Sequence, residues 1–166
     1  MGTRRLDPLA LLVLILTVIP IRCGQAAADT GEPSLRWVDG GSLEVEGRAF
    51  EDRRSSWDRL PARAEGMVRP PVWGNSRHSA GIVIRFISDS PTIAARWRLS
   101  SDRIAMPHMP ATGVSGVDLY VRMEGIEGPV WRWVANGRPT GSENESILIS
   151  DLPEISREWL LYLPLY

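Results

Sequence analysis

The chain has 166 residues, of which 43% are hydrophobic, which is enough for one core in about one domain. Its 19 basic residues are balanced by 20 acidic ones, and this near-neutral charge argues against nucleic acid and against an anionic membrane surface as ligands. The 15 glycines and 13 prolines favour a loop-rich fold over a helical one.

The N-terminus has the order of a secretory signal peptide. Arg4 and Arg5 precede an apolar run over 9–21, and three alanines at 26–28 precede Asp29. The run is too short for a membrane-spanning helix of about 20 residues. We therefore predict a signal peptide over 1–28, cleavage after Ala28, and an exported protein, periplasmic or extracellular, without membrane attachment.

Cys23 offers an alternative, because an acylated cysteine behind an apolar run would make the chain a lipoprotein. Arg22 directly before it is a poor match to the small residue that such sites prefer, so simple cleavage is favoured. Cleavage after Ala28 removes this cysteine, the only one in the chain, and leaves no disulfide and no thiol nucleophile. The polar residues 29–34 are expected to form a flexible lead-in.

Two segments alternate clearly between apolar and polar residues, as half-buried strands do. In Thr92–Leu99, the odd-numbered positions Ile93, Ala95 and Trp97 share one face, and two arginines lie on the other. The segment after Gly116 alternates in the same way up to Met123. Both are predicted as strands.

Weaker strand patterns recur between turn residues along the rest of the chain. They cover Leu35–Val38, Leu43–Val45, Gly81–Phe86, Val130–Ala135, Ser146–Ile149 and Trp159–Leu163. Only Pro61–Gly66 suggests a helical turn. The predicted fold for 35–166 is therefore all-β, a single sandwich of the jelly-roll type.

Catalytic motifs are missing from the sequence. It contains no Gly-Asp-Ser-Leu, no Gly-x-Ser-x-Gly and no His-Glu-x-x-His, and its two histidines, His78 and His108, lack partners at metal-ligand spacing. No catalytic residue, metal or cofactor is predicted. His78 is expected in a surface loop, whereas His108, between Met-Pro pairs, is a candidate for a domain interface.

The seven tryptophans allow two interpretations. Alternation and the usual burial of large aromatics favour a core position for Trp97, Trp131 and Trp133. The alternative is a sugar-binding platform formed by Trp131 and Trp133, which share a strand face, or by Trp57, which lies in polar surroundings.

A resemblance to a known family begins at Gly116-Val117-Asp118-Leu119-Tyr120. This segment matches the Gly-x-Asp-Leu-Tyr motif that gives its name to the N-terminal domain of SGNH hydrolase-type (GDSL-type) esterases. Further similarity, in the same order, lies at 45–48, 57–62, Trp73, 79–81, 85–86, 96–97, 106–109 and 161–166. The chain thus resembles this domain from about Leu35 to its end.

The resemblance implies a β-sandwich followed by a separate catalytic domain, which carries the Ser, Gly, Asn and His of the SGNH set. None of these catalytic positions has a counterpart here. We therefore expect a non-catalytic accessory domain of a secreted esterase, which packs on the catalytic domain and shapes its substrate cleft. The expected substrates of the whole enzyme are acylated compounds, with acylated carbohydrates as candidates. The apolar end at 159–166 favours a longer polypeptide. A stand-alone carbohydrate-binding or interaction module is the alternative.

The motif also has a physical interpretation. Gly113 and Gly116 are expected to adopt backbone conformations closed to other residues, and Asp118 and Tyr120 share one strand face. These two side chains can bind a neighbouring domain, or they can simply tie down the local structure. The predicted interface residues are His108, Asp118, Tyr120, Tyr162 and Tyr166.

Overall fold

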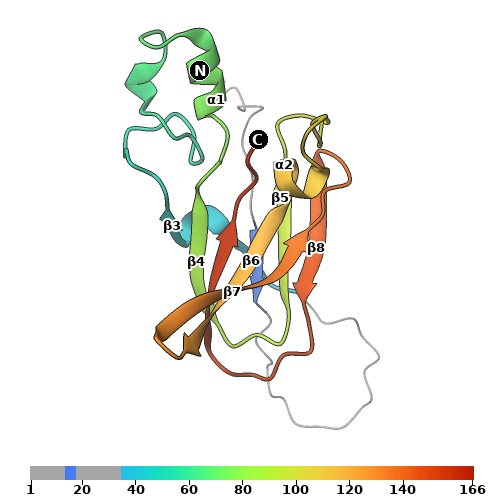
Figure 1. Ribbon diagram of the computed structural model, residues 1–166. Helices are drawn as coiled ribbons and strands as arrows, with labels where there is room; N and C mark the ends of the chain where they lie inside the picture. The colour runs from blue at the N-terminus through green and yellow to red at the C-terminus, as the bar shows by residue number, and fades with distance from the viewer. Residues whose placement is uncertain (1–13, 18–34) are drawn as a thin grey trace, which may run out of the picture.

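The computed structural model describes residues 14–17 and 35–166 (Figure 1). Its strands are β1 Leu14–Thr17, β2 Trp37–Asp39, β3 Glu44–Glu46, β4 Val83–Ser88, β5 Ile93–Arg98, β6 Val117–Gly125, β7 Gly128–Gly137, β8 Glu143–Ile149 and β9 Arg157–Tyr162. The short helices are η1 Gly40–Ser42, η2 Ala62–Ala64, α1 Pro70–Ser76 and α2 Ala111–Ser115.

The strands form two antiparallel sheets that face each other. One sheet has the order β2-β1-β5-β8, and the other has the order β3-β4-β9-β6-β7. The all-β prediction is confirmed, and every predicted strand has a counterpart close to its expected position. The alternating apolar side chains explain this, since each half-buried strand needs only a period of two to present one face to the core.

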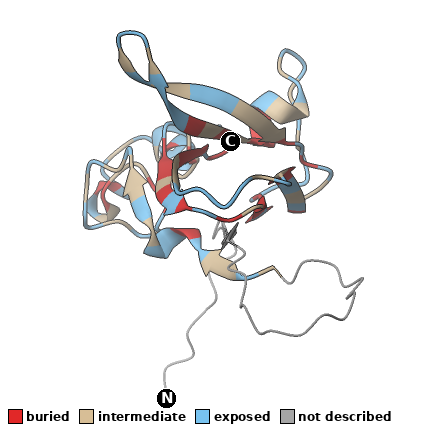
Figure 2. Cartoon of the chain, turned by 90° about the horizontal axis from the view of Figure 1, so that it is seen from below, coloured by how far each residue is buried: buried red, intermediate tan, exposed pale blue. Residues whose placement is uncertain are grey.

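The core lies between the two sheets, where buried residues gather in Figure 2. Ile93, Ala95 and Trp97 of β5 face Leu119 of β6 and Leu161 of β9 across it. The Trp97 side chain is 1% exposed, and its indole Nε1 donates to the Ser115 carbonyl oxygen at 3.0 Å. This bond satisfies the one polar atom of a large buried ring and ties α2 to the core.

β1 falls inside the predicted signal peptide. Its backbone pairs with β2 on one side and with β5 on the other, so Leu14 aligns with both Asp39 and Arg96. The rest of that peptide, the lead-in at 29–34 and Cys23 lie outside the described residues. Removal of 1–28 would take β1 out of the sheet between β2 and β5.

Three of the short helices, η1, α1 and α2, were not predicted. α1 begins with Pro70 and Pro71, whose fixed φ and missing N–H groups suit the first turn of a helix. At five residues, α2 is too short to show a helical hydrophobic pattern. The predicted turn at Pro61–Gly66 is present as η2.

The glycines of the motif region do not have the unusual backbone conformation that was expected, and at Gly116 the reason for glycine is the lack of room for a side chain. Gly113 lies in α2 and Gly116 has φ −79°, so the expectation of special backbone angles there is wrong. A Cβ on Gly116 would instead overlap the Thr112 carbonyl oxygen and lie 2.9 Å from Asn136 Nδ2. Glycine is needed at 116 because α2 and β7 approach the start of β6 so closely.

Candidate functional site

Asp118 and Tyr120 of the motif lie on the outer face of the five-stranded sheet, because the intervening Leu119 is fully buried in the core. One carboxylate oxygen of Asp118, Oδ1, accepts hydrogen bonds from the Trp133 indole Nε1 and from Asn136 Nδ2, both at 3.0 Å. Charge-assisted bonds of this kind are stronger than neutral ones. Asp118 therefore holds two side chains of the neighbouring strand.

A β-bulge brings these partners together. Leu119 pairs with Ala135 but Tyr120 pairs with Trp133, so Val134 is an extra residue on β7. Without the bulge, two residues three apart in a strand would face opposite sides of the sheet. The extra residue places both Trp133 and Asn136 on the outer face beside Asp118.

Tyr120 also contacts Tyr162 of β9, and the two ring centroids are 5.4 Å apart. Tilted aromatic pairs at this distance are favourable. Burial, the Asp118 carboxylate and Tyr162 together raise the pKa of the Tyr120 phenol, so the phenol stays neutral at physiological pH and can donate a hydrogen bond.

An ion network crosses the same face. The Arg85 guanidinium of β4 binds both Glu46 and Glu158, and Arg122 donates to the second oxygen of Glu158 at 2.7 Å. Hydrogen bonds from Arg122 and Arg85 lower the pKa of Glu158, so this carboxylate is ionised. Arg85 also lies over the Trp131 ring at 5.2 Å, a cation–π contact.

The structure confirms one of the predictions for the positions of the tryptophans and contradicts others. Trp97 is in the core as predicted, but Trp131 and Trp133 face outward, so the core position expected for them is wrong. Trp133 is 58% exposed. Trp57 is only 5% exposed and packs in the core, which removes it as a surface platform.

His78 and Tyr166 meet at one end of the sandwich, where Figure 1 places the C-terminus between α1 and α2. Their rings contact edge to face with centroids 5.2 Å apart. Two clefts of about 270 Å³ each are lined by both residues, one with Met106 and one with Met109 and Leu165. We call these the C-terminal clefts.

Hydrogen bonds to backbone carbonyl oxygens hold this end together. Arg59 Nε donates to the His78 carbonyl oxygen at 3.0 Å, and Ser79 Oγ donates to the Pro164 carbonyl oxygen at 2.6 Å. The Tyr166 N–H donates to the Val114 carbonyl oxygen. Burial and the nearby Arg59 charge lower the pKa of His78, which favours its neutral form.

His108 is exposed at the tip of a turn closed by backbone bonds between Met106 and Met109. Since those methionines line the C-terminal clefts, His108 and Tyr166 belong to one end of the molecule. Asp118, Tyr120 and Tyr162 lie on the sheet face instead. The predicted interface residues thus fall into two separate surfaces.

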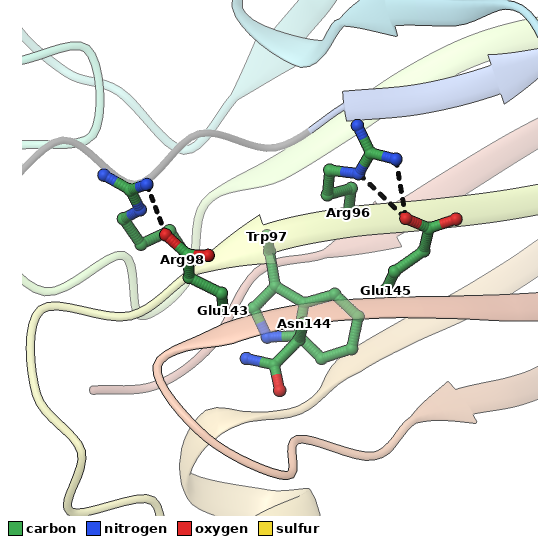
Figure 3. A pocket seen from close by; sticks show the side chains of 6 residues that line it. All are labelled: Arg96, Trp97, Arg98, Glu143, Asn144 and Glu145. Carbon is green, nitrogen blue, oxygen red and sulfur yellow. Dashed lines mark hydrogen bonds and ion pairs between the residues drawn. The ribbon is translucent and has the colours of Figure 1, made fainter.

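The outer face of the four-stranded sheet also has a hollow, of about 290 Å³ (Figure 3). Two cross-strand ion pairs, Arg96 with Glu145 and Arg98 with Glu143, flank it. Arg96 also lies 4.2 Å from the Trp37 ring centroid. Because these cations are paired with carboxylates, the hollow has little charge left for a charged ligand.

The part of the chain that the structure describes, residues 14–17 and 35–166, lacks two features. No group of three or more His, Cys, Asp or Glu side chains in this part is placed to hold a metal ion. None of its helices is both long and apolar enough to cross a membrane.

The sequence did not predict the ion network of Arg85, Glu158 and Arg122, nor the contact of His78 with Tyr166. The network joins β3, β4, β9 and β6, whose order in the sheet has no signal in local sequence. His78 and Tyr166 are far apart in the chain, and only the fold brings them together. A weak signal existed for Arg85 and Arg122, since both are charged positions alternating with apolar strand residues.

Comparison with known proteins gives one family and one structural relative. A family model described as the GxDLY N-terminus of SGNH hydrolase-type esterases matches residues 35–166. A crystal structure described as a GDSL-like lipase from Bacteroides ovatus is similar at 29% identity and a TM-score of 0.69. The match covers 76% of this chain and 36% of that one. No curated protein matches.

Proposed function

The chain belongs to the family of GxDLY N-terminal domains of SGNH hydrolase-type esterases, and we propose that it is the non-catalytic accessory domain of an exported enzyme of this type. The similar chain described as a GDSL-like lipase supports this, because this chain spans only about a third of its length. The signal-peptide pattern at 1–28 supports export.

We place the contact with the catalytic domain at the C-terminal clefts. Tyr166 is 45% exposed and Leu165 is 39% exposed, and both lie against His78 and Met109 in these clefts. Exposed apolar side chains around clefts are typical of surfaces that pack on a partner. A domain docked here brings His108, on the adjoining turn, to the edge of the catalytic domain and shapes its substrate cleft.

The single observation that carries this proposal is the family match over 35–166, together with the missing catalytic set. The test is to read the gene beyond the codon for Tyr166 and to assay the 166-residue chain and any longer product on a small acetyl ester. The longer product is expected to hydrolyse the ester, and the 166-residue chain is not. A reading frame that stops at Tyr166, or hydrolysis by the short chain, would contradict the proposal.

Docking is tested in the longer product. His78→Ala combined with Tyr166→Ala is expected to loosen the contact and to increase proteolytic cleavage between the domains. Trp133→Ala, on the sheet face, is the matched control and should leave cleavage unchanged. Equal cleavage of both variants would place the contact with the catalytic domain elsewhere on the chain.

A further inference from the structure

Aromatic side chains gather on the outer face of the five-stranded sheet. Trp133 is 58% exposed and Tyr162 is 43% exposed, and Tyr120 lies half-buried between them. They come from the adjacent strands β7, β9 and β6. With strands about 4.8 Å apart, the three rings form a row across roughly 10 Å of surface. Contiguous exposed aromatics of this kind usually mark a binding site.

From this row we infer that the outer face of the five-stranded sheet binds an uncharged polysaccharide. Ring faces of Trp and Tyr stack on the C–H faces of pyranose sugars, while neighbouring polar atoms bind the hydroxyls. The inference goes beyond the proposed function and does not depend on it, because binding by this face requires no catalytic domain.

The rings are held in place before any ligand arrives. The 3.0 Å bond from Trp133 Nε1 to Asp118 fixes the indole, and the contact with Tyr162 fixes Tyr120. Exposed side chains that are already ordered lose little conformational freedom on binding.

Hydrogen-bonding atoms remain free around the row. Among the described residues, neither the Tyr120 nor the Tyr162 hydroxyl has a hydrogen bond, and both bonds to Asp118 use Oδ1, which leaves Oδ2. The raised pKa of Tyr120 keeps its hydroxyl as a donor. Donors and acceptors beside stacked rings match the hydroxyl pattern of a sugar.

The charges on this face argue against a charged ligand. Arg85 is paired with Glu46 and Glu158, and Arg122 is paired with Glu158. These pairs leave no net positive charge to bind a phosphate or sulfate group. The whole chain has a net charge of −1. A neutral polymer therefore fits this surface better than a nucleic acid or an acidic glycan.

The test is affinity electrophoresis of the full chain in gels containing soluble xylan, hydroxyethylcellulose or galactomannan, with dextran sulfate as the charged comparison. Retardation by at least one neutral polymer is expected. Trp133→Ala should weaken it about tenfold, as loss of a large aromatic contact can do. Tyr162→Ala should weaken it less. Arg132→Ala, on the opposite face of β7, is the matched control and should bind like the parent chain.

With the 166-residue chain, three results would overturn the inference. They are retardation by none of the neutral polymers, retardation by dextran sulfate alone, and retardation that Trp133→Ala leaves unchanged. In the longer product, protection of the Trp133 region from hydrogen exchange by the catalytic domain would also overturn it, since the face would then be a domain interface. None of these results bears on whether the chain lacks esterase activity.

Discussion

Trp133 and Asp118 lie on neighbouring strands, and the indole nitrogen of one donates a 3.0 Å hydrogen bond to the carboxylate of the other. The bond connects the Asp of the family motif to the most exposed tryptophan on the sheet face. It therefore gives the motif a definite physical role. Asp118 orients a side chain for which alternation and the usual burial of large aromatics favour a core position.

A double-mutant cycle should measure this bond. Asp118→Ala is expected to lower the free energy of unfolding by about 1–2 kcal/mol, because two donors lose their acceptor. Trp133→Phe should lower the free energy of unfolding by less, since the indole is partly exposed. A coupling of about 0.5–1.5 kcal/mol between the two changes is expected in urea unfolding. Strictly additive effects would show that the bond contributes nothing to stability.

Gly116→Ala should destabilise the fold by about 1–3 kcal/mol, the usual cost of forcing an extra methyl group into a packed site. The added carbon would overlap the Thr112 carbonyl oxygen, and backbone moves less readily than a side chain. Urea unfolding is the measurement. Gly141→Ala is the matched control, because a Cβ there has no neighbour within 4 Å. Equal effects at the two positions would rule out the steric explanation.

His78 should make stability depend on pH. Its pKa in the folded chain is lowered, so the unfolded chain, with a pKa near 6.5, takes up the proton first as pH falls. Stability is unaffected above that value and decreases as pH falls from about 6.5 to the folded pKa. His78→Gln should therefore lose less stability than the parent between about pH 7.5 and pH 5.5.

His108→Gln, which changes the exposed histidine, is the control for this comparison. It should lose as much stability as the parent over the same pH range. If the stability of His78→Gln and that of the parent decrease equally as pH falls, another group is responsible for the pH dependence.

Arg85→Lys should weaken the ion network. A lysine keeps the charge but cannot bind Glu46 and Glu158 at once in a fixed geometry, and it stacks less well on Trp131. A loss of about 1 kcal/mol is expected at low salt, and a smaller one at high salt, because part of the network is exposed. Arg132→Lys should show neither effect, and a salt-independent loss would point to packing alone.

A chain that begins at Asp29 should exchange its β5 amides faster than the full chain. Removal of 1–28 takes away β1, whose backbone pairs with residues 93–96 of β5. The amides of β5 that faced β1 then become those of an edge strand. Hydrogen exchange at Val117–Val121 in β6 is the internal control. Unchanged protection of β5 would mean that another segment takes the place of β1.

The sequence by itself determined which segments of 35–166 become strands and which family the chain belongs to, whereas β1 lies in a segment for which it predicted a signal peptide. Ile93, Ala95 and Trp97 alternate with an alanine and two arginines, and this local period of two requires no knowledge of partner strands. The motif could be found in the same way, since its five residues are contiguous from Gly116 to Tyr120.

Only the tertiary structure decided which side of β7 faces the core. Alternation separates Val130 and Val134 from Trp131 and Trp133 but does not say which of the two sides is buried, and the usual burial of large aromatics favoured the wrong one. Pairing with β6 and the bulge at Val134 set the choice. The meeting of His78 with Tyr166, and of Arg85 with Glu158, likewise depends on strand order, which is fixed by long-range packing rather than by neighbouring residues.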